Sequence, residues 1–214
     1  MINILIRTHD RPEKLKECIK SIENQTYKDW RIIISADNDK AEKWTKPYGY
    51  EYIRTDKIRY KKRIEKSRMK KEWNRYLNAL QGRATEGFIM YMDEDMVLYT
   101  ENSLQLVANN SHEDRLLIYK YKIRQDIGIR PEKGYWRQTP QRTHISTGCF
   151  SHPAKHKVRW RGISAGDYFS VSNLYNRLKT TWLDEIILMG QAISDEKKIK
   201  KGKRKKIRRN RRKK

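Results

Sequence analysis

The sequence has few cysteines and no long hydrophobic run, and each shortage excludes a class of protein. Its two cysteines, Cys18 and Cys149, are too few for a disulfide framework, and the absence of a CxxC or Cys/His cluster argues against a zinc site. No apolar stretch approaches the ~20 residues that cross a bilayer. The first six residues lack a basic segment before an apolar one, so we expect no secretory signal and a cytoplasmic protein.

Acidic residues are scarce relative to basic ones. The chain has 26 Asp and Glu against 50 Lys and Arg, which gives a net charge of +24. The excess is concentrated in residues 197–214, where fourteen of eighteen residues are basic and none is acidic. This segment lacks apolar periodicity, so we expect a disordered tail that can contact nucleic acid, an anionic membrane or a nuclear-import receptor. The sequence therefore divides into a domain over residues 1–196 and a basic tail.

The first part of the domain alternates short apolar runs with an amphipathic segment. Residues 2–6 form an apolar run that ends in a polar cluster, which is typical of a strand buried on both faces. Apolar side chains recur at helical spacing over residues 13–23, and the next apolar run covers residues 30–35. A strand–helix–strand unit of this kind predicts a ligand site at the carboxyl ends of the strands.

The remainder of the domain continues the alternation and predicts an α/β fold with a mostly parallel central sheet flanked by helices. Residues 127–150 are punctuated by glycine and proline, which indicates strands and loops. The other expected elements are strands over 52–53, 88–92 and 116–123, and helices over 57–80, 102–109, 165–178 and 182–192.

Polar clusters follow three of the expected strands, over residues 8–11, 37–39 and 93–95. If these strands are neighbours in one parallel sheet, all three clusters lie along the same edge. The third cluster, Asp93-Glu94-Asp95, is the most distinctive because alternate side chains of an extended chain point the same way. Two carboxylates held ~4–5 Å apart repel by several kcal/mol at a dielectric constant of ~20. A hard divalent cation would relieve this repulsion. The alternative is a solvated acidic turn.

Other polar residues are candidates for the same site. Asp37 could accept a hydrogen bond from a nucleobase, with Thr8 and Arg11 framing the pocket, although a helix N-cap or Asx-turn is an equally simple use of Asp37. Asp167 follows a glycine at the expected start of a helix, where the dipole stabilises a carboxylate that could also act as a base.

Several motifs together resemble a known family. The stretch IRTHDRP covers residues 6–12, SIENQTY covers residues 21–27, Asn74 follows, and GFIMYMDED covers residues 87–95. In this order the chain resembles family 2 glycosyltransferases with the GT-A fold, and it is similar to glycosyltransferases of large DNA viruses. The resemblance covers about residues 2–98 and, more loosely, residues 143–170.

The resemblance implies a nucleotide-binding half. In the family pattern, Thr8 and Asp37 would contact the nucleobase, Arg11 would lie at the same pocket, and Asn74 would belong to the nucleotide site.

The resemblance also implies a metal and a base. Asp93 and Asp95 would form a D-x-D motif that links the nucleoside and Mn²⁺ or Mg²⁺ to the diphosphate. Asp167 would be the catalytic base, with Gly166 in the place where inverting members have another acidic residue.

The function implied by the resemblance is metal-dependent, inverting transfer of a sugar from a nucleotide-diphosphate sugar, with a UDP-sugar favoured. The acceptor would be a hydroxyl of a glycan, a protein or a lipid-linked molecule. Two other functions fit the residues alone. One is a nucleic-acid-binding protein that acts through its basic tail, and the other is a metal-dependent nucleotidyltransferase.

Overall fold

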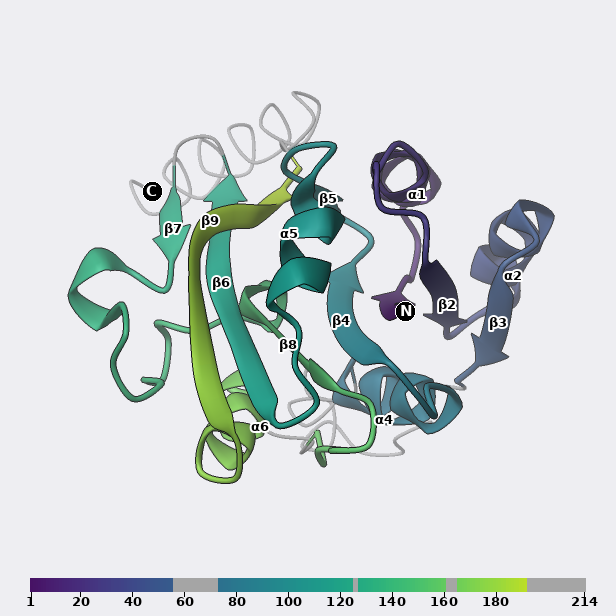
Figure 1. The fold of residues 1–214 in the computed structure, drawn as a ribbon. Coiled ribbons are helices and arrows are strands. Elements are labelled where there is room, and N and C mark those ends of the chain that lie inside the picture. The colour runs from purple at the N-terminus through teal and green to yellow at the C-terminus, as the bar shows by residue number, and fades with distance from the viewer. Residues whose placement is uncertain (56–72, 125–126, 161–164, 192–214) are drawn as a thin grey trace, which may run out of the picture.

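A single nine-stranded sheet runs through the part of the chain that the computed structural model describes, which is residues 1–55, 73–124, 127–160 and 165–191 (Figure 1). The strands are β1 (Ile2–Arg7), β2 (Trp30–Ala36), β3 (Glu51–Arg54), β4 (Phe88–Asp93), β5 (Met96–Leu98), β6 (Arg115–Arg124), β7 (Gly128–Arg130), β8 (Phe150–Pro153) and β9 (Lys179–Gly190). Their order is β3-β2-β1-β4-β8-β6-β9-β5, and β7 pairs with β6.

Helices pack against this sheet at several places. They are α1 (Pro12–Glu23), α2 (Asp39–Thr45), α4 (Trp73–Arg83), α5 (Ser103–Asn110) and α6 (Gly166–Tyr175). Helix α4 packs against β1 and β2, α1 contacts β5, and α5 contacts β9. Pro12 begins α1, where its missing N–H leaves no helical hydrogen bond unmade.

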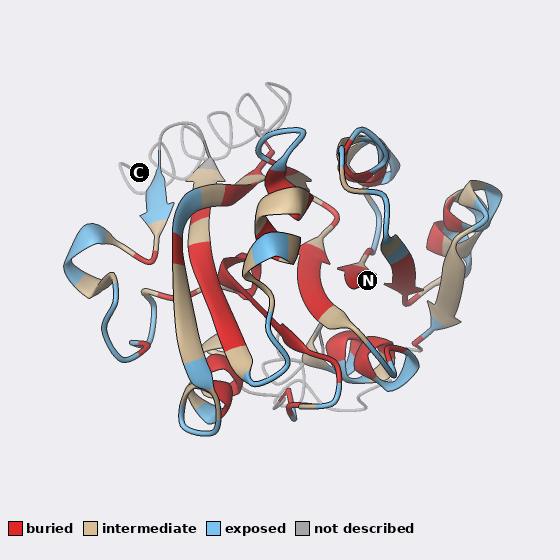
Figure 2. Ribbon diagram, in the orientation of Figure 1, coloured by how far each residue is buried: buried red, intermediate tan, exposed pale blue. Residues whose placement is uncertain are grey.

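The parallel half of the sheet contains the centre of the core. Strands β3, β2, β1 and β4 are all parallel, and successive residues Ile4, Leu5 and Ile6 of β1 are fully buried. Burial of consecutive residues requires cover on both faces, and Figure 2 shows β4 as buried along most of its length. Beyond β4 the sheet becomes mixed, since β8 is antiparallel to both β4 and β6.

The sequence predicts most of these elements correctly. The α/β class and the mostly parallel central sheet flanked by helices are confirmed. The predicted helix over residues 57–80 is observed from Trp73, and its earlier part lies outside the described residues, as does the tail over 197–214. Cys18 and Cys149 are both buried and form no disulfide. No helix among the described residues is long and apolar enough to cross a membrane.

The predicted helix over residues 182–192 is wrong, because residues 182–190 belong to strand β9, and Ala192 lies outside the described residues. Strand β9 pairs in parallel with β6 and, through its last residues, antiparallel with β5. The apolar residues Leu183 and Ile187 are spaced as in a helix, and Ile187 and Leu188 are both fully buried. A short apolar segment fits either structure by periodicity. Here the pairing with β6 makes the segment a strand. The register of this pairing is irregular between Tyr119 and Tyr121.

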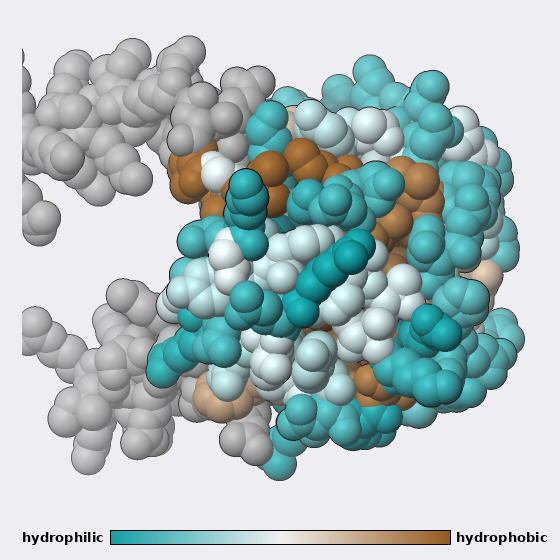
Figure 3. Space-filling model, turned by 60° about the vertical axis from the view of Figure 1, so that its left-hand side comes forward, coloured by the Kyte–Doolittle hydropathy of each residue, from teal (hydrophilic) through white to brown (hydrophobic). Residues whose placement is uncertain are grey.

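The face shown in Figure 3 is mostly hydrophilic or neutral, with a band of apolar side chains across its upper part. Among the described residues, the exposed large hydrophobic side chains are Tyr99, Ile127 and Ile129. The last two lie at β7, the strand outside the main path of the sheet.

Gly190 provides a test of strand β9. A Cβ atom on Gly190 would overlap the carbonyl oxygen of Ile123 and lie 2.8 Å from Tyr121 Oη. We therefore expect Gly190→Ala to lower the free energy of unfolding by about 1–3 kcal/mol, as overpacking does. In a helix, the same change would raise it by about 0.5–1 kcal/mol.

Urea denaturation of the two proteins measures this difference. Gly82→Ala is the matched control, because Gly82 lies in α4 with no atom within 4 Å of an added Cβ. We expect this control to be stabilised by about 0.5–1 kcal/mol. Stabilisation by both substitutions would contradict the assignment of Lys179–Gly190 as a strand.

Candidate active site

Three polar clusters meet at the carboxyl edge of the parallel strands, as the sequence predicts. Strand β1 lies between β2 and β4, so Thr8, Asp37 and Asp93 follow or end three neighbouring strands. The Thr8 N–H donates to the carbonyl of Ser35, 2.8 Å away, and the Glu94 N–H donates to the carbonyl of Arg7, 3.2 Å away. These bonds continue the sheet beyond its last regular pairs and fix the three clusters relative to one another.

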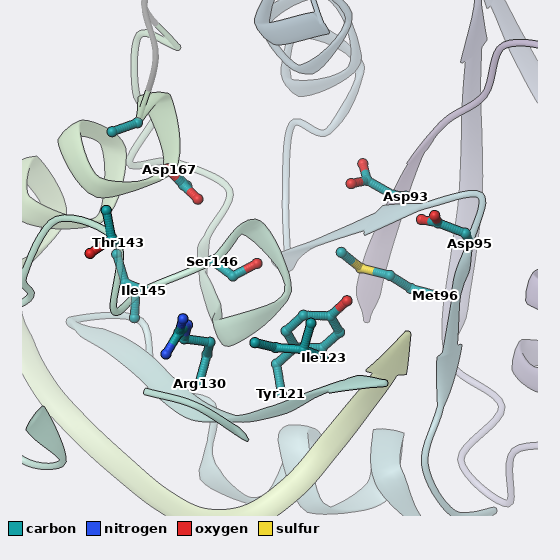
Figure 4. A pocket seen from close by; sticks show the side chains of 11 residues that line it. Asp93, Asp95, Met96, Tyr121, Ile123, Arg130, Thr143, Ile145, Ser146 and Asp167 are labelled. Carbon is teal, nitrogen blue, oxygen red and sulfur yellow. The ribbon is translucent and has the colours of Figure 1, made fainter. Parts of the chain in front are cut away.

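Asp93 and Asp95 face a cavity of about 450 Å³, and Asp167 lines the same cavity. Figure 4 shows Asp167 across the cavity from the two other carboxylates. The volume is within the range of about 300–1,000 Å³ that is typical of small-molecule sites. The structure therefore brings together the expected D-x-D carboxylates and the expected base, which lie more than 70 residues apart in sequence.

Glu94 points away from the cavity and into the protein. Its side chain is 2% exposed and accepts hydrogen bonds from the Thr8 hydroxyl, from the backbone N–H of His9 at 2.8 Å, and from Arg11 Nε. Arg11 also donates from Nη1 to Asp95 Oδ2 at 2.6 Å. Thr8 and Arg11 are thus joined to the acidic triplet by direct contacts.

Arg7 binds the first carboxylate of the triplet. Its Nη2 donates to Asp93 Oδ2 at 2.9 Å, and its Nε donates to Asp93 Oδ1. Burial alone would lower the Arg7 pKa, but Asp93, Asp167 and Asp95 more than offset this and hold the pKa above its ordinary value. Sequence reasoning missed Arg7, although its position opposite Asp93 in the β1–β4 register follows once the two strands are paired.

Asp37 lies at the end of β2 with its carboxylate surrounded by protein groups. The Tyr76 hydroxyl donates to Oδ2 at 2.9 Å, and Oδ1 lies 2.7 Å from His9 Nδ1. The side chain of Asn38 also donates to Oδ1 and caps α2 by accepting from the N–H of Ala41. Asn38, rather than Asp37 or Asp39, is therefore the N-cap of this helix.

Asp167 lies in the first turn of α6, with its carboxylate toward the cavity (Figure 4). Burial raises its pKa above the ordinary value for aspartate, and nearby Arg7 partly opposes the shift. The preceding Gly166 lies directly against Asn74, because a Cβ on Gly166 would overlap Asn74 Nδ2. This packing gives a steric reason for glycine where the family pattern has a second acidic residue, and it joins Asn74 to the helix that carries Asp167.

The remaining wall of the cavity comes from the later half of the chain. It includes Tyr121, Arg130, Thr143, Ser146 and Ala165. Thr143 and Ala165 have φ angles of 72° and 64°, a conformation that is uncommon for residues other than glycine and that occurs often at functional sites. Sequence reasoning identified none of these five residues, since irregular segments contribute most of them.

Two of the histidines, His144 and His152, pack against aromatic side chains. His152 is fully buried, with Nε2 2.8 Å from the Tyr91 hydroxyl, and burial lowers its pKa to about 3. His144 stacks on Tyr135 with ring centroids 3.6 Å apart.

The cavity is lined by three carboxylates, those of Asp93, Asp95 and Asp167, but they do not form a complete metal site. Among the described residues, no group of three or more His, Cys, Asp or Glu side chains is placed to hold a metal ion. Mg²⁺ in particular is often bound by one or two carboxylates together with substrate phosphates. Asp93 and Asp95 both line the cavity, and Asp95 fits this arrangement because it uses only Oδ2 for Arg11. Asp93 would have to exchange a contact with Arg7, which binds both of its oxygens.

Several solved structures share this fold. The chain superposes on residues 1–349 of Staphylococcus aureus TarS with a TM-score of 0.66 at 13% identity, covering 89% of this chain and 60% of that one. TarS has also been solved with UDP and with UDP-GlcNAc. The mannosyltransferase PcManGT of Pyrobaculum calidifontis, in complex with GDP-Man and Mn²⁺, gives a TM-score of 0.61 at 10% identity, covering 90% of this chain and 57% of that one. The fold is thus of the GT-A type.

Sequence comparison then identifies the family. The family model for glycosyl transferase family 2 matches residues 3–177, so the chain belongs to this family. A curated relative, described as the uncharacterized glycosyltransferase MJ1057 of Methanocaldococcus jannaschii, is 30% identical over 144 residues. The match covers 62% of this chain and 47% of MJ1057, so this chain spans less than half of that relative. The resemblance to family 2 is confirmed, and the similarity to viral enzymes stays a prediction.

Substitution of Glu94 tests whether the buried hydrogen bonds of the site stabilise the fold. We expect Glu94→Gln to lower the free energy of unfolding by about 2–3 kcal/mol, because it weakens charge-assisted hydrogen bonds from Arg11 and His9 in a buried position. Urea denaturation measures this change. Glu113→Gln is the matched control, since Glu113 pairs with Lys155 while 84% exposed and should change stability by less than about 0.5 kcal/mol. Equal effects of the two substitutions would contradict a structural role for Glu94.

Proposed function

We propose that this chain transfers a sugar from a nucleotide-diphosphate sugar to an acceptor hydroxyl with inversion at the anomeric carbon. One observation carries the proposal: Asp93 and Asp95, at the carboxyl end of a parallel strand, share one cavity with Asp167. Membership of glycosyl transferase family 2 supports the reaction class. We favour a UDP-sugar as donor, the kind of nucleotide sugar present in a solved complex of TarS.

The nucleotide would lie at the carboxyl ends of β1 and β2. Asp37 and Thr8 would recognise the base, and Asp37 could do so by exchanging one of its present hydrogen bonds from His9 or Tyr76. Arg11 is 39% exposed and could contact the phosphates while remaining paired with Glu94. Asn74 would close the site from α4 beside Gly166.

A divalent cation, Mn²⁺ or Mg²⁺, would be held by Asp95 together with Asp93. When bound, such an ion neutralises the negative charge that develops on the leaving diphosphate. The chain's own contribution is to hold the two carboxylates at the end of β4, with Glu94 anchored in the interior between them.

Asp167 would act as the general base. It would accept the proton of the acceptor hydroxyl as that oxygen attacks the anomeric carbon, on the side of the cavity opposite the D-x-D motif. Attack from the side opposite the leaving group inverts the anomeric configuration. Because burial raises the Asp167 pKa, the base becomes protonated at a higher pH than an exposed aspartate with a pKa of ~3.9. The transfer rate should therefore fall on acidification above that ordinary range.

The acceptor would be a glycan, a protein or a lipid-linked hydroxyl that enters beside Arg130, Thr143 and Ser146. We place the catalytic domain at residues 1–196 and propose that the tail brings it to an anionic membrane surface or to nucleic acid, in the cytoplasm or the nucleus. The tail lies outside the described residues, so its charge alone supports this part of the proposal.

Two substitutions separate binding from chemistry. We expect Asp167→Asn to lower the rate of UDP release from UDP-hexoses by at least about 100-fold, because the general base is lost, while UDP binding is retained. We expect Asp95→Asn to remove the metal-dependent part of UDP binding. Asp184→Asn is the control, since Asp184 is 62% exposed and pairs with Lys120 away from the cavity. Parental rates for Asp167→Asn, with UDP release measured at several pH values, would exclude this base.

Truncation after Glu196 distinguishes the enzyme from the alternative of a nucleic-acid-binding protein. The truncated chain should release UDP from its donor at the rate of the full chain, but it should bind anionic vesicles and RNA more weakly, because fourteen cationic side chains are lost. Sedimentation with vesicles and a filter-binding assay at several salt concentrations measure the second effect. If neither chain releases UDP from any donor while truncation abolishes RNA binding, the binding-protein alternative is favoured. Product analysis by mass, with NTPs in place of nucleotide sugars, tests the nucleotidyltransferase alternative.

A further inference from the structure

The proposed reaction assigns no role to Arg7, although this residue contacts the acidic triplet directly. It is the last residue of β1 and lies opposite Asp93 in the parallel register, so the two side chains emerge on the same face of the sheet. Its guanidinium contacts both oxygens of Asp93 through Nε and Nη2. Both side chains are mostly buried, with 16% of Arg7 and 23% of Asp93 exposed. A two-pronged contact of this kind fixes the orientation of the carboxylate as well as its charge.

The acidic triplet is already largely neutralised by the protein itself. Arg7 pairs with Asp93, and Arg11 pairs with both Glu94 and Asp95. Two guanidinium groups therefore oppose three carboxylates, which leaves one net negative charge where the triplet alone would carry three. Without a nucleotide, a metal ion at this edge would be attracted by a smaller net negative charge. Both oxygens of Asp93 would already be bound by Arg7.

We propose that Arg7 is a tethered cation that competes with the divalent metal for Asp93, so that the metal binds tightly only together with the diphosphate. This inference rests on the proposed function. A diphosphate brings both oxygen ligands for the metal and acceptors that a guanidinium binds well, so Arg7 could shift its hydrogen bonds from Asp93 to phosphate as the metal enters. Arg7 is a positioning residue in this scheme, because it controls when Asp93 is free to bind the metal.

Reciprocal coupling is the measurable consequence. If UDP strengthens Mn²⁺ binding by releasing Asp93 from Arg7, Mn²⁺ must strengthen UDP binding by the same factor. Removing the guanidinium should reduce this coupling and improve Mn²⁺ binding in the absence of a nucleotide. A merely structural role of Arg7 predicts the opposite for the metal, since a loosened site would bind Mn²⁺ more weakly.

The experiment measures Mn²⁺ binding to the full chain by electron paramagnetic resonance of free Mn²⁺, with and without UDP. We expect Arg7→Met to bind Mn²⁺ alone on the order of tenfold more tightly than the parent, and to gain less affinity when UDP is added. Arg7→Lys keeps the charge but loses the two-pronged contact. Its affinity for Mn²⁺ should therefore lie between those of the parent and Arg7→Met. Arg31→Met is the control, because Arg31 pairs with Glu51 at the opposite end of the parallel strands and should leave both affinities unchanged.

The unfolding temperature provides a second readout if Arg7→Met is unstable. Mn²⁺ without nucleotide should raise the unfolding temperature of Arg7→Met more than that of the parent, because the ion replaces the missing cation at Asp93. If the parent binds Mn²⁺ with UDP but neither Arg7 variant gains nucleotide-free Mn²⁺ affinity, the competition is excluded and the proposed function stands. If neither the parent nor the variants bind Mn²⁺ with any nucleotide, the metal site itself is wrong, and this inference is wrong with it.

Discussion

The parallel pairing of β1 with β4 sets the position of every acidic group at the site. In this register Arg7 lies opposite Asp93, and the next residues along, Thr8 and Glu94, meet through a hydrogen bond on the other face of the sheet. A slip of one residue would exchange the two faces. Asp93 would then turn into the interior and Glu94 would turn into the cavity. The buried apolar residues of β1 and β4 prevent this slip, because their packing fixes which side chains point inward.

The same register places a high density of charge in a partly buried position. Asp93, Glu94 and Asp95 are compensated by two arginines that come from the end of β1 and the start of α1. Asp167, in α6, lies on the opposite wall of the cavity. Burial raises the pKa of its carboxyl group, and Arg7 partly opposes this shift. Arg7 therefore interacts both with the proposed metal-binding wall and with the wall that carries the proposed base. Its contact with both oxygens of Asp93 is why we assign it a role in the order of binding.

The sequence predicts the nucleotide-binding half of the fold well because local patterns determine it. Consecutive buried apolar residues mark β1, β2 and β4, and the alternation of side chains in extended backbone correctly separates Asp93 and Asp95 from Glu94. The second half depends on contacts between distant segments. The strand β9 looked helical because its periodicity is ambiguous, and only its pairing with β6 and β5 decides the structure.

The candidate site shows the same division. The sequence indicates Asp167 through its place after a glycine at an expected helix start and through the resemblance to a family motif, while the steric reason for Gly166 beside it requires the contact with Asn74. Thr143 lines the cavity from an irregular segment and has a positive φ. No local sequence pattern predicts this conformation. The catalytic and binding roles of these residues stay predictions.

The most direct test of the account is calorimetric titration of the full chain with UDP, GDP, TDP and CDP, each with Mn²⁺, with Mg²⁺ and with EDTA. The account predicts that one nucleotide, UDP, binds clearly more tightly than the others, and that EDTA removes most of its affinity. Such a result would establish the carboxyl edge of β1, β2 and β4 as a metal-dependent nucleotide site. No heat of binding with any nucleotide in the presence of either metal would contradict the central claim.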